Sequence, residues 1–381
     1  MRRPAVIETL AELVRINSIN PAYDNGVPEA GVADFVGDFF AARGIETWLQ
    51  EVHPGRSNRI ARLSGRGAGR IVLEAHMDTA SVNGMTIDPF DPVIRDGRLY
   101  GRGACDTKAG LAAMMEAVAS LHRDGIEPAC EVWLCAAVDE EFSFTGVTRF
   151  CQGLKADAAI VAEPTELRNI SASKGVLRWR IRTNGKAAHS SKPHLGVNAI
   201  EHMAAVVQAI GEENRKLAAA SHPLLGPGTL NVGVIYGGVQ VNFVPDGCVI
   251  EIDRRLLPGE RAEAVLAVHE AMLGRLRESV PGFNAVQELP PMLVDEALET
   301  PLDSPVVQTA SRVLERMGLD GTPAGVPYGS DASKLARQGV PSLIFGPGSI
   351  DQAHAAVEWV ECDQVERAVD FYRGFVLEFC P

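Results

Sequence analysis

Apolar residues in the first part of the chain follow two spacings that alternate. Residues 4–16 and 29–43 carry apolar side chains three or four positions apart, which predicts amphipathic helices, and a third helix is expected at 108–122. Short apolar runs between these helices predict strands, at 45–50, 59–63, 71–75, 131–138 and 158–162. Because strands alternate with helices, we expect an α/β fold with a helix-covered, largely parallel sheet.

The pattern changes after Lys174. Residues 176–183 alternate apolar and basic side chains, as expected for a strand with one face in water. The elements that follow are a helix, two strands, a helix and a strand, at 197–220, 229–236, 248–256, 259–278 and 283–289. This β-α-β-β-α-β order predicts a ferredoxin-like α+β domain of residues 174–291. Because the α/β pattern then returns, we expect it to be an insertion in a main domain of residues 1–173 and 292–381.

The composition limits the partners of the protein. The chain has 381 residues, of which 46% are hydrophobic, and 36 Lys and Arg against 49 Asp and Glu give a formal net charge of −13. This charge repels nucleic-acid phosphates, so we expect no nucleic-acid partner. No apolar run approaches the roughly 20 residues of a membrane-spanning helix, so we also expect no membrane partner.

The start of the chain and its cysteines bear on the compartment. Glu8, Glu12 and Arg15 interrupt the apolar core that a signal peptide would need, so we expect no targeting segment. The chain has seven cysteines without CxxC spacing, which suits reduced thiols. We therefore expect a cytoplasmic protein.

Polar residues follow the strand predicted at 71–75. That run is apolar enough to be a central strand with both faces covered, and His76 and Asp78 come where it should end. In open α/β sheets ligands bind at the carboxyl ends of the strands, so a His and an Asp two positions apart are well placed for a site. The alternative is a strand-end histidine that bonds a neighbouring carboxylate.

Four further polar clusters lie beside predicted strand ends or loops. Asp106 precedes a helix, Glu140 and Glu141 follow the strand ending at 138, Glu163 follows the strand at 158–162, and His354 follows a Gly-rich loop. Each has an ordinary alternative: a helix N-cap, a solvated charge pair, a loop acid and a surface histidine. Together they favour a metal site, because one imidazole and one or two carboxylates per ion, with a further acid free, is the ligand set of a hydrolytic two-metal centre.

The motifs around these residues resemble those of the zinc aminoacylase superfamily. The matching runs are HMD at 76–78, GRGACDTKAG at 101–110, DEEFSFTG at 139–146, AEPT at 162–165 and the downstream His354. This superfamily includes acetylornithine deacetylase, succinyl-diaminopimelate desuccinylase, aminoacylase and the glutamate carboxypeptidases. The resemblance covers essentially the whole chain in order. One departure is Ala80, where the first motif often has a branched apolar residue. This difference affects packing and leaves the proposed ligands intact.

The resemblance implies a ligand set for two zinc ions per chain, with Co²⁺ able to substitute. His76 and Glu163 would hold one zinc, Glu141 and His354 the other, and Asp106 would bridge them.

Two further acids take roles beside the metals. Asp78 would orient His76 and raise its basicity. Glu140 would be the general base, because an unligated carboxylate can take the proton of a water activated by two cations and pass it to the leaving amine.

The inserted domain also carries family motifs. The runs GKAAHSS at 185–191 and GVNAI at 196–200 resemble the dimerising lid of these enzymes, which implies a homodimer. His189 would then reach into the active site of the partner and contact the oxyanion. The alternative is an ordinary polar turn after a strand.

Three residues match family positions that contact substrate: Asn242, Arg255 and Ser330. Arg255 would anchor a carboxylate, because a guanidinium can pair with it bidentately. An arginine on the exposed face of a strand is the alternative.

We therefore expect a two-zinc hydrolase that cleaves the amide bond of N-acyl-L-amino acids. The HSS, GVNAI and SDAS runs look most like the acetylornithine deacetylase branch. A succinyl-diaminopimelate desuccinylase, a general aminoacylase, and a dipeptidase or carboxypeptidase that takes a dipeptide remain alternatives. A non-catalytic binding protein is disfavoured, because it has no need of an unligated base beside the metals.

Overall fold

The computed structural model describes residues 4–380, which form two compact units. Unit 1 consists of residues 4–171, Thr300–Ala324 and 330–380. Unit 2 consists of Ala172–Glu299 and Gly325–Gly329. Each unit has its own cluster of buried hydrophobic side chains, so each is described by itself.

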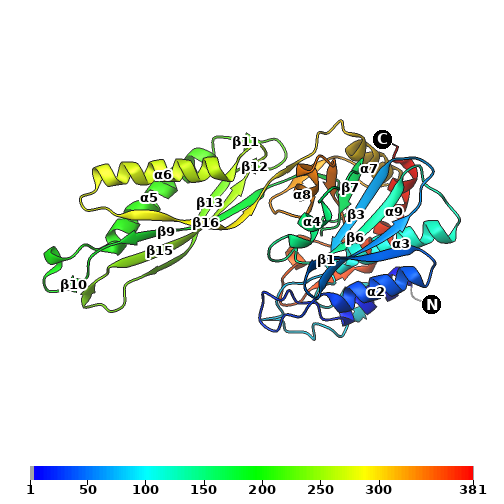
Figure 1. Cartoon of the computed structure of the whole chain (residues 1–381), viewed down its shortest axis with the longest axis horizontal. Coiled ribbons are helices and arrows are strands. Elements are labelled where there is room, and N and C mark those ends of the chain that lie inside the picture. Colours follow the sequence, from blue (N-terminus) through cyan, green and yellow to red (C-terminus); the bar gives the residue numbers. More distant parts are fainter. Residues whose placement is uncertain (1–3, 381) are drawn as a thin grey trace. The chain divides into compact units, whose positions relative to one another are not determined.

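Unit 1 is built on a sheet with the strand order β1-β2-β6-β3-β7-β19-β8 (Figure 1). The bounds of these strands are Glu46–His53 for β1, Arg56–Leu63 for β2, Glu131–Ala137 for β6, Arg70–His76 for β3, Ala158–Val161 for β7, Ser342–Ile344 for β19 and Ile170–Ser173 for β8. Strands β6, β3, β7 and β19 are parallel to one another, and the outer pairings are antiparallel. The prediction of a largely parallel α/β sheet is confirmed.

Two groups of helices cover this sheet. The first group comprises α1 (Ala5–Arg15), α3 (Lys108–Arg123), α7 (Pro305–Arg316) and α9 (Cys362–Glu378), which contact one another through α3 and α9. The second comprises α4 (Thr145–Phe150) and α8 (Ala332–Arg337), while α2 (Ala30–Ala41) packs on β1 and β2. Figure 1 shows α4 and α8 on one side of the labelled strands and α3 and α9 on the other. Helix α3 is buried along most of its length, and its many alanines allow close packing.

A small sheet that the sequence pattern did not predict joins two loops of unit 1. It has the order β20-β5-β4, with bounds Trp359–Glu361, Arg98–Tyr100 and Val93–Arg95. Strands β4 and β5 form a hairpin whose turn residues Asp96 and Gly97 both have positive φ, as a two-residue turn requires. The pairing of β5 with β20 brings the loop after residue 100 next to the segment that precedes residue 359.

Unit 2 has a four-stranded antiparallel sheet with the order β13-β15-β9-β16. The strand bounds are Thr229–Gly237, Gly247–Leu256, Gly175–Asn184 and Ala285–Asp295, and the helices α5 (Ala199–Leu217) and α6 (Ala262–Ser279) pack on the sheet and on each other. Strand β15 alternates half-buried and buried residues, since only one of its faces meets the helices. The β-α-β-β-α-β order predicted for this segment is the order observed.

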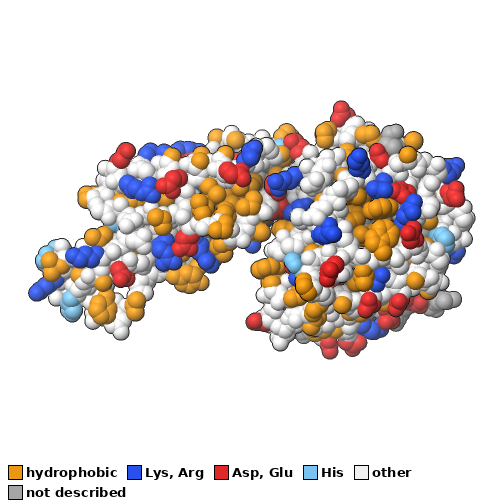
Figure 2. All heavy atoms as spheres, in the orientation of Figure 1, with side chains coloured by type: hydrophobic (Ala, Val, Ile, Leu, Met, Phe, Trp, Pro, Cys, Tyr) orange, Lys and Arg blue, Asp and Glu red, His pale blue; other side chains and the backbone are white. Residues whose placement is uncertain are grey.

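Short elements complete the two units. They are β10 (Ala188–His189), η1 (Pro193–Leu195), β11 (Ser221–His222), β12 (Gly226–Pro227), β14 (Phe243–Val244), β17 (Leu298–Glu299), β18 (Ala324–Val326) and η2 (Ile350–Gln352). No helix within residues 4–380 is both long enough and apolar enough to cross a bilayer. On the face shown in Figure 2, basic and acidic side chains are interspersed over the surface.

Candidate metal centre and active site

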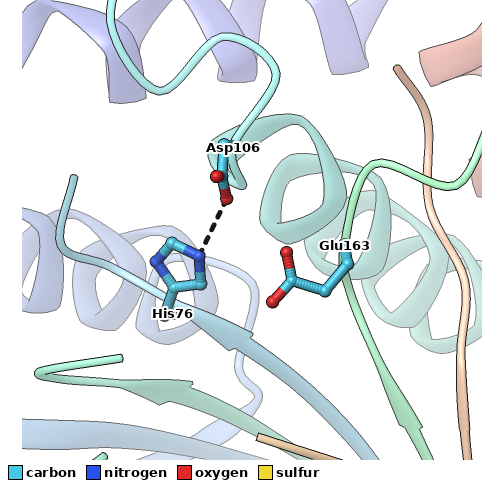
Figure 3. A group of neighbouring side chains, drawn as sticks. All are labelled: His76, Asp106 and Glu163. Atoms are coloured by element: carbon cyan, nitrogen blue, oxygen red, sulfur yellow. Dashed lines mark hydrogen bonds and ion pairs between the residues drawn. The ribbon is translucent and has the colours of Figure 1, made fainter. Parts of the chain in front are cut away.

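Five side chains of unit 1 form two groups that share one member. His76, Asp106 and Glu163 make the first group, and Asp106, Glu141 and His354 make the second. Within each group the potential ligand atoms all lie within 4.8 Å of one another. Figure 3 shows the side chains of the first group turned toward a common point. These are the five residues that the sequence motifs singled out as metal ligands.

The sheet accounts for the closeness of three of these residues. His76 is the last residue of β3, Glu141 follows β6, and Glu163 follows β7. Because β6 and β7 flank β3 and run parallel to it, their carboxyl ends meet at one edge of the sheet. The predicted ligand positions at strand ends are therefore neighbours in space.

Asp106 lies between two histidines. Its Oδ1 is 3.1 Å from Nε2 of His76, and its Oδ2 is 3.4 Å from Nε2 of His354. His354 also lies 3.1 Å from Oε2 of Glu141. Thr107 is the N-cap of α3, so Asp106 is not the helix cap that its sequence position also allowed. Each carboxylate oxygen of Asp106 faces a different group, which is the arrangement of a bridging ligand.

The charges in the site fit divalent cations. Burial disfavours the charged form of Asp106, but hydrogen bonds to His354 and His76 outweigh this and lower its pKa. Hydrogen bonds with Asp106 and Glu141 raise the pKa of His354 to about 10. Burial, with the charge of Asp106, raises the pKa of Glu163 well above its usual range. A metal ion would relieve both the burial cost and the repulsion between these carboxylates.

Glu163 supplies the most direct test of the metal hypothesis. Its side chain is buried, and burial together with the nearby charge of Asp106 raises its pKa. Coordination of a cation would stabilise the charged form of this carboxylate. Two imidazoles and three carboxylates are also ligands that zinc accepts. The residues present therefore fit a two-metal centre.

Glu140 lies beside the ligands and belongs to neither group. Its Oε2 is 4.0 Å from Nε2 of His76, and its side chain is only 13% exposed. Burial raises the pKa of Glu140 well above its usual range, although the charge of His76 opposes this. Neither Glu140 nor Glu141 is therefore part of a solvated charge pair, and Glu140 is positioned as an acid free of the metals.

Asp78 is buried and accepts hydrogen bonds from several directions. Its carboxylate binds the backbone N–H groups of Glu140 at 3.1 Å and Glu141 at 3.0 Å. The backbone carbonyl of Asp78, at 2.9 Å, is the hydrogen-bond partner of His76 Nδ1, while the Asp78 carboxylate is 3.7 Å away. The contact that orients His76 is thus made by the main chain of Asp78, and its carboxylate holds the turn of the two glutamates.

Comparison with known proteins decides the family. Residues 72–378 match the family model described as peptidase family M20/M25/M40. The chain is 31% identical over 393 residues to an acetylornithine deacetylase from Vibrio campbellii, with both chains covered in full. The chain belongs to peptidase family M20/M25/M40. The resemblance inferred from the motifs is confirmed, and the protein is a metal-dependent amidohydrolase of this family.

Other relatives and solved structures agree with this family. An acetylornithine deacetylase from Salmonella arizonae is 31% identical over 387 residues, covering 99% of this chain and 98% of its own. Aminopeptidase PepT from Bacillus cereus has a TM-score of 0.82 at 23% identity, with 98% of each chain covered. A dinuclear metal binding peptidase of the M20 family from Bacillus subtilis has a TM-score of 0.73 at 17% identity, again with 98% of each chain covered. The structural similarities show that the fold is that of M20 peptidases.

The buried ion pair of Arg102 and Glu358 in this M20 family member was not predicted from the sequence. Glu358 is fully buried, and its Oε1 accepts the backbone N–H groups of Cys105 at 2.9 Å and Asp106 at 3.1 Å. Its Oε2 accepts a hydrogen bond from Nη1 of Arg102 at 2.5 Å. Glu358 therefore fixes the backbone of the bridging candidate Asp106. It lies four residues after His354, but nothing in that spacing alone distinguishes it from a surface acid.

The remaining residues matched to the M20 family lie mostly in unit 2. His189 is exposed, and its Nδ1 is 2.8 Å from Oγ of Ser191. The backbone carbonyl of Asn242 accepts the N–H of Ser190 at 3.0 Å, so Asn242 lies next to His189. Arg255, on β15, donates from Nε to Oδ1 of Asp253 at 2.9 Å. These three residues share unit 2, whereas the five ligand candidates share unit 1.

Ser330 lies in unit 1 and is buried. Its Oγ accepts the backbone N–H of Ala332 at 3.3 Å at the start of α8, and its carbonyl accepts from Oγ of Ser333 at 3.1 Å. The hydroxyl of Ser330 is thus already engaged in the fold, and a substrate contact by this residue stays a prediction.

Proposed function

We propose that this M20 family enzyme is a two-zinc hydrolase that cleaves the amide bond of N-acyl-L-amino acids, with an activity like that of acetylornithine deacetylase. The observation that carries the proposal is Asp106, whose two oxygens face two different imidazoles. An unligated acid, Glu140, lies beside them. The relatives named acetylornithine deacetylase, which match over the full length of the chain, support the substrate class.

His76 and Glu163 would hold one zinc, and Glu141 and His354 would hold the other. Asp106 would be a ligand of both ions. When bound, the two ions would lower the pKa of a water molecule and polarise the substrate carbonyl. Glu140 takes the proton of the attacking water and gives it to the amine nitrogen as the C–N bond breaks. Since burial favours the protonated form of Glu140, its carboxyl can hold that proton between the two steps. The products are a carboxylate and a free amino acid.

Unit 2 would act as the lid and dimerisation domain. Strand β13 is an edge strand of its sheet and exposes Ile235 and Tyr236, which supports pairing with a second copy of the chain. We further propose that His189 donates a hydrogen bond to the developing oxyanion in the site of the partner, and that Asn242 contacts substrate. Arg255 uses only Nε within residues 4–380, so its terminal nitrogens can pair with a substrate carboxylate.

A peptidase activity is the second candidate. The matching family is named for peptidases, and deacylation and dipeptide hydrolysis both break an amide beside an amino acid. A desuccinylase and a general aminoacylase differ from the main proposal only in the acyl or side-chain pocket. We also propose a cytoplasmic location, because seven cysteines without CxxC spacing suit reduced thiols in a reducing compartment.

The neighbouring residues Glu140 and Glu141 offer a matched test. Glu140→Gln should retain zinc and lose turnover by a factor of about 10²–10⁴, because general base catalysis contributes about that much. Glu141→Gln should lose zinc from one site, because it removes a ligand. Metal analysis by mass spectrometry and a screen of N-acetyl, N-succinyl and dipeptide substrates would measure both effects.

Three results of this test would be decisive. Turnover of N-acetylornithine by the wild-type protein together with these two phenotypes would support the proposal. Turnover of dipeptides only would favour the peptidase. A Glu140→Gln protein with wild-type turnover would exclude the assigned base.

A further inference from the structure

The segment of residues 16–23 lies outside the part of the chain that matches the family model, which begins at residue 72. In the sequence, Asn20-Pro21 follows the helix predicted at residues 4–16. In the structure it runs beside the residues that follow β3. The backbone carbonyl of Ser18 accepts the N–H of Thr79 at 2.9 Å. The backbone N–H of Asn20 donates to the carbonyl of Thr79, also at 2.9 Å. The segment therefore borders the site directly.

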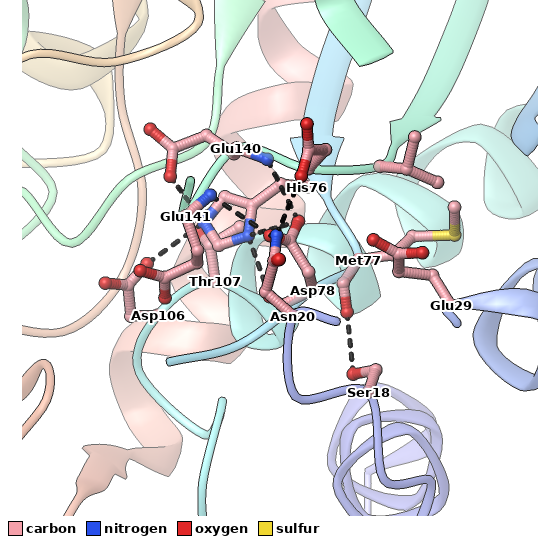
Figure 4. Close-up of polar contacts among 12 residues, drawn as sticks. Ser18, Asn20, Glu29, His76, Met77, Asp78, Asp106, Thr107, Glu140 and Glu141 are labelled. Atoms are coloured by element: carbon pink, nitrogen blue, oxygen red, sulfur yellow. Dashed lines mark hydrogen bonds and ion pairs between the residues drawn. The ribbon is translucent and has the colours of Figure 1, made fainter. Parts of the chain in front are cut away.

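The side chain of Asn20 is completely buried between two carboxylates. Its Nδ2 donates to Oδ2 of Asp78 at 2.8 Å and to Oδ1 of Asp139 at 3.0 Å. Its Oδ1 accepts the backbone N–H of Ala22 at 2.9 Å. Carboxylates only accept hydrogen bonds and the amide N–H only donates, so these three partners fix the orientation of the amide. Figure 4 shows Asn20 next to Asp78, beside Glu140 and Glu141.

The two carboxylates that Asn20 joins hold the turn that carries the base. Asp78 accepts the N–H groups of Glu140 and Glu141. Asp139, which precedes Glu140, accepts hydrogen bonds from the hydroxyls of Ser143 and Thr145. Asp139 has a φ of 71°, an uncommon conformation that its surroundings must maintain. Asn20 thus connects the support on one side of Glu140 with the support on the other.

A neutral amide suits this position better than any charged group. Asp139 already pairs with Arg56 at 3.0 Å, and Arg56 pairs with the buried Glu29. Asn20 places two N–H donors between two anions without adding a charge. Each carboxylate can therefore still accept its other hydrogen bonds, which come from backbone N–H groups at Asp78 and from hydroxyls at Asp139. An aspartate at position 20 would have the same size but would repel both neighbours.

We propose that Asn20 is a positioning residue for Glu140, acting through Asp78 and Asp139. The proposal rests on the proposed function, in which Glu140 is the base. Asn20 does not touch the substrate or the metals. It fixes the backbone from which the Glu140 carboxylate projects, and a base that is displaced by a fraction of an ångström transfers a proton less efficiently.

The experiment compares Asn20→Ala and Asn20→Asp with Ser18→Ala as the matched control. Ser18 lies in the same segment and donates from Oγ to the carbonyl of Met77 at 2.8 Å, but its side chain contacts neither carboxylate. The full-length variants are assayed with N-acetylornithine at saturating zinc. The measurements are kcat, KM, bound metal and thermal unfolding, together with a crystal structure of Asn20→Ala.

We expect Asn20→Ala to lower kcat by about 10- to 100-fold, with KM changed by less than about threefold and two metals retained. Asn20→Asp should lose at least as much, while Ser18→Ala should stay within about twofold of the wild type. The crystal structure should show the turn at Glu140 displaced. If Asn20→Asp fails to fold, Asn20→Ala alone decides.

Two outcomes would overturn the inference. One is a wild-type kcat in a metal-loaded Asn20→Ala protein. The other is an equal loss in Ser18→Ala, which would mean that the segment matters only for folding. Failure of the proposed function is distinguishable from both, because then the wild type and Ser18→Ala would not turn over the substrate either.

Discussion

The candidate functional side chains of the two units differ in how firmly they are held. In unit 1, the carboxylate of Asp78 accepts three hydrogen bonds, and the backbone of Asp106 is fixed by the buried Glu358. In unit 2, His189 is exposed, and among residues 4–380 its imidazole bonds to Ser191 of the same turn. Metal ligands and a general base need a fixed geometry. The residues proposed to hold the metals and to act as the base are thus held in place within unit 1, whereas the oxyanion donor proposed in unit 2 is not.

The largest effect that would test this division is expected at His189. His189→Ala should lower turnover by a factor of about 10²–10³, because an oxyanion donor contributes about that much, and it should leave zinc content unchanged. Steady-state kinetics and metal analysis would measure both. His194→Ala is the matched control, since His194 is an exposed histidine of the adjoining η1 turn.

Mixing the His189→Ala chain with a Glu140→Gln chain tests the proposed dimer. A heterodimer would contain one site with both residues intact, so activity should return after subunit exchange. A mixture that stays inactive despite verified exchange would mean that His189 acts within its own chain or has no part in the reaction.

The next effect concerns the support of Asp106 in unit 1. Glu358→Gln should weaken the binding of both metals by about 10- to 100-fold, because removal of a group that orients a ligand has this effect. It should also destabilise the protein by about 3–5 kcal/mol, since it removes the charged partner of the buried Arg102. Calorimetric zinc titration and thermal unfolding would measure the two losses.

Glu361→Gln provides the control for Glu358. Glu361 on β20 pairs with Arg98 on β5, next to the pair of Glu358 and Arg102, but the pair of Glu361 and Arg98 is partly exposed. Its removal should cost no more than about 1 kcal/mol and should not alter zinc affinity. Equal losses of zinc affinity in the two variants would show that the strand pairing, and not the Glu358 carboxylate, supports the site.

A smaller effect is expected at Arg255 in unit 2. Arg255→Ala should lower kcat/KM for N-acyl amino acids about tenfold, because a charge-assisted hydrogen bond is lost, and should leave zinc content unchanged. Arg178→Ala is the control, since Arg178 pairs with the same Asp253. If Arg255→Ala lowers activity equally on amides that lack a carboxylate, Arg255 has a role in folding instead of recognition.

The smallest effect is a release of protons on metal binding. In the metal-free protein the raised pKa of His354, about 10, keeps its imidazole protonated at pH 7, and the pKa of His76 is raised as well. Zinc binds neutral imidazole, so binding at pH 7 should release protons. Calorimetry in buffers of different ionisation enthalpy would detect the release, and an enthalpy independent of the buffer would contradict it.

The sequence predicted those parts of the molecule that depend on local pattern. Apolar periodicity was enough for the helices and the parallel strands, and strand ends at His76, Glu141 and Glu163 were enough to bring three ligands together. The short β4, β5 and β20 were missed, because three-residue strands have too few positions to show a period.

The supporting residues could not be predicted, for a different reason. Asn20 contacts Asp139 across 119 positions, and Glu358 contacts Asp106 across 252 positions. Nothing in the local pattern around either residue marks it as buried, because the partners that satisfy it are assembled only by the tertiary fold. The same holds for the contact between His76 and Asp78, because the sequence does not show that the main-chain carbonyl of Asp78 makes it.

The most direct test of the central claim is a zinc titration of the metal-free wild-type and Asp106→Asn proteins, followed by calorimetry. The account predicts about two zinc ions per wild-type chain, and a loss of affinity at both sites in Asp106→Asn, because one carboxylate serves both groups. Thermal unfolding of the metal-free forms would verify that both proteins are folded. A folded Asp106→Asn protein that keeps one site at wild-type affinity, or a wild type that binds a single zinc, would contradict the shared two-metal centre.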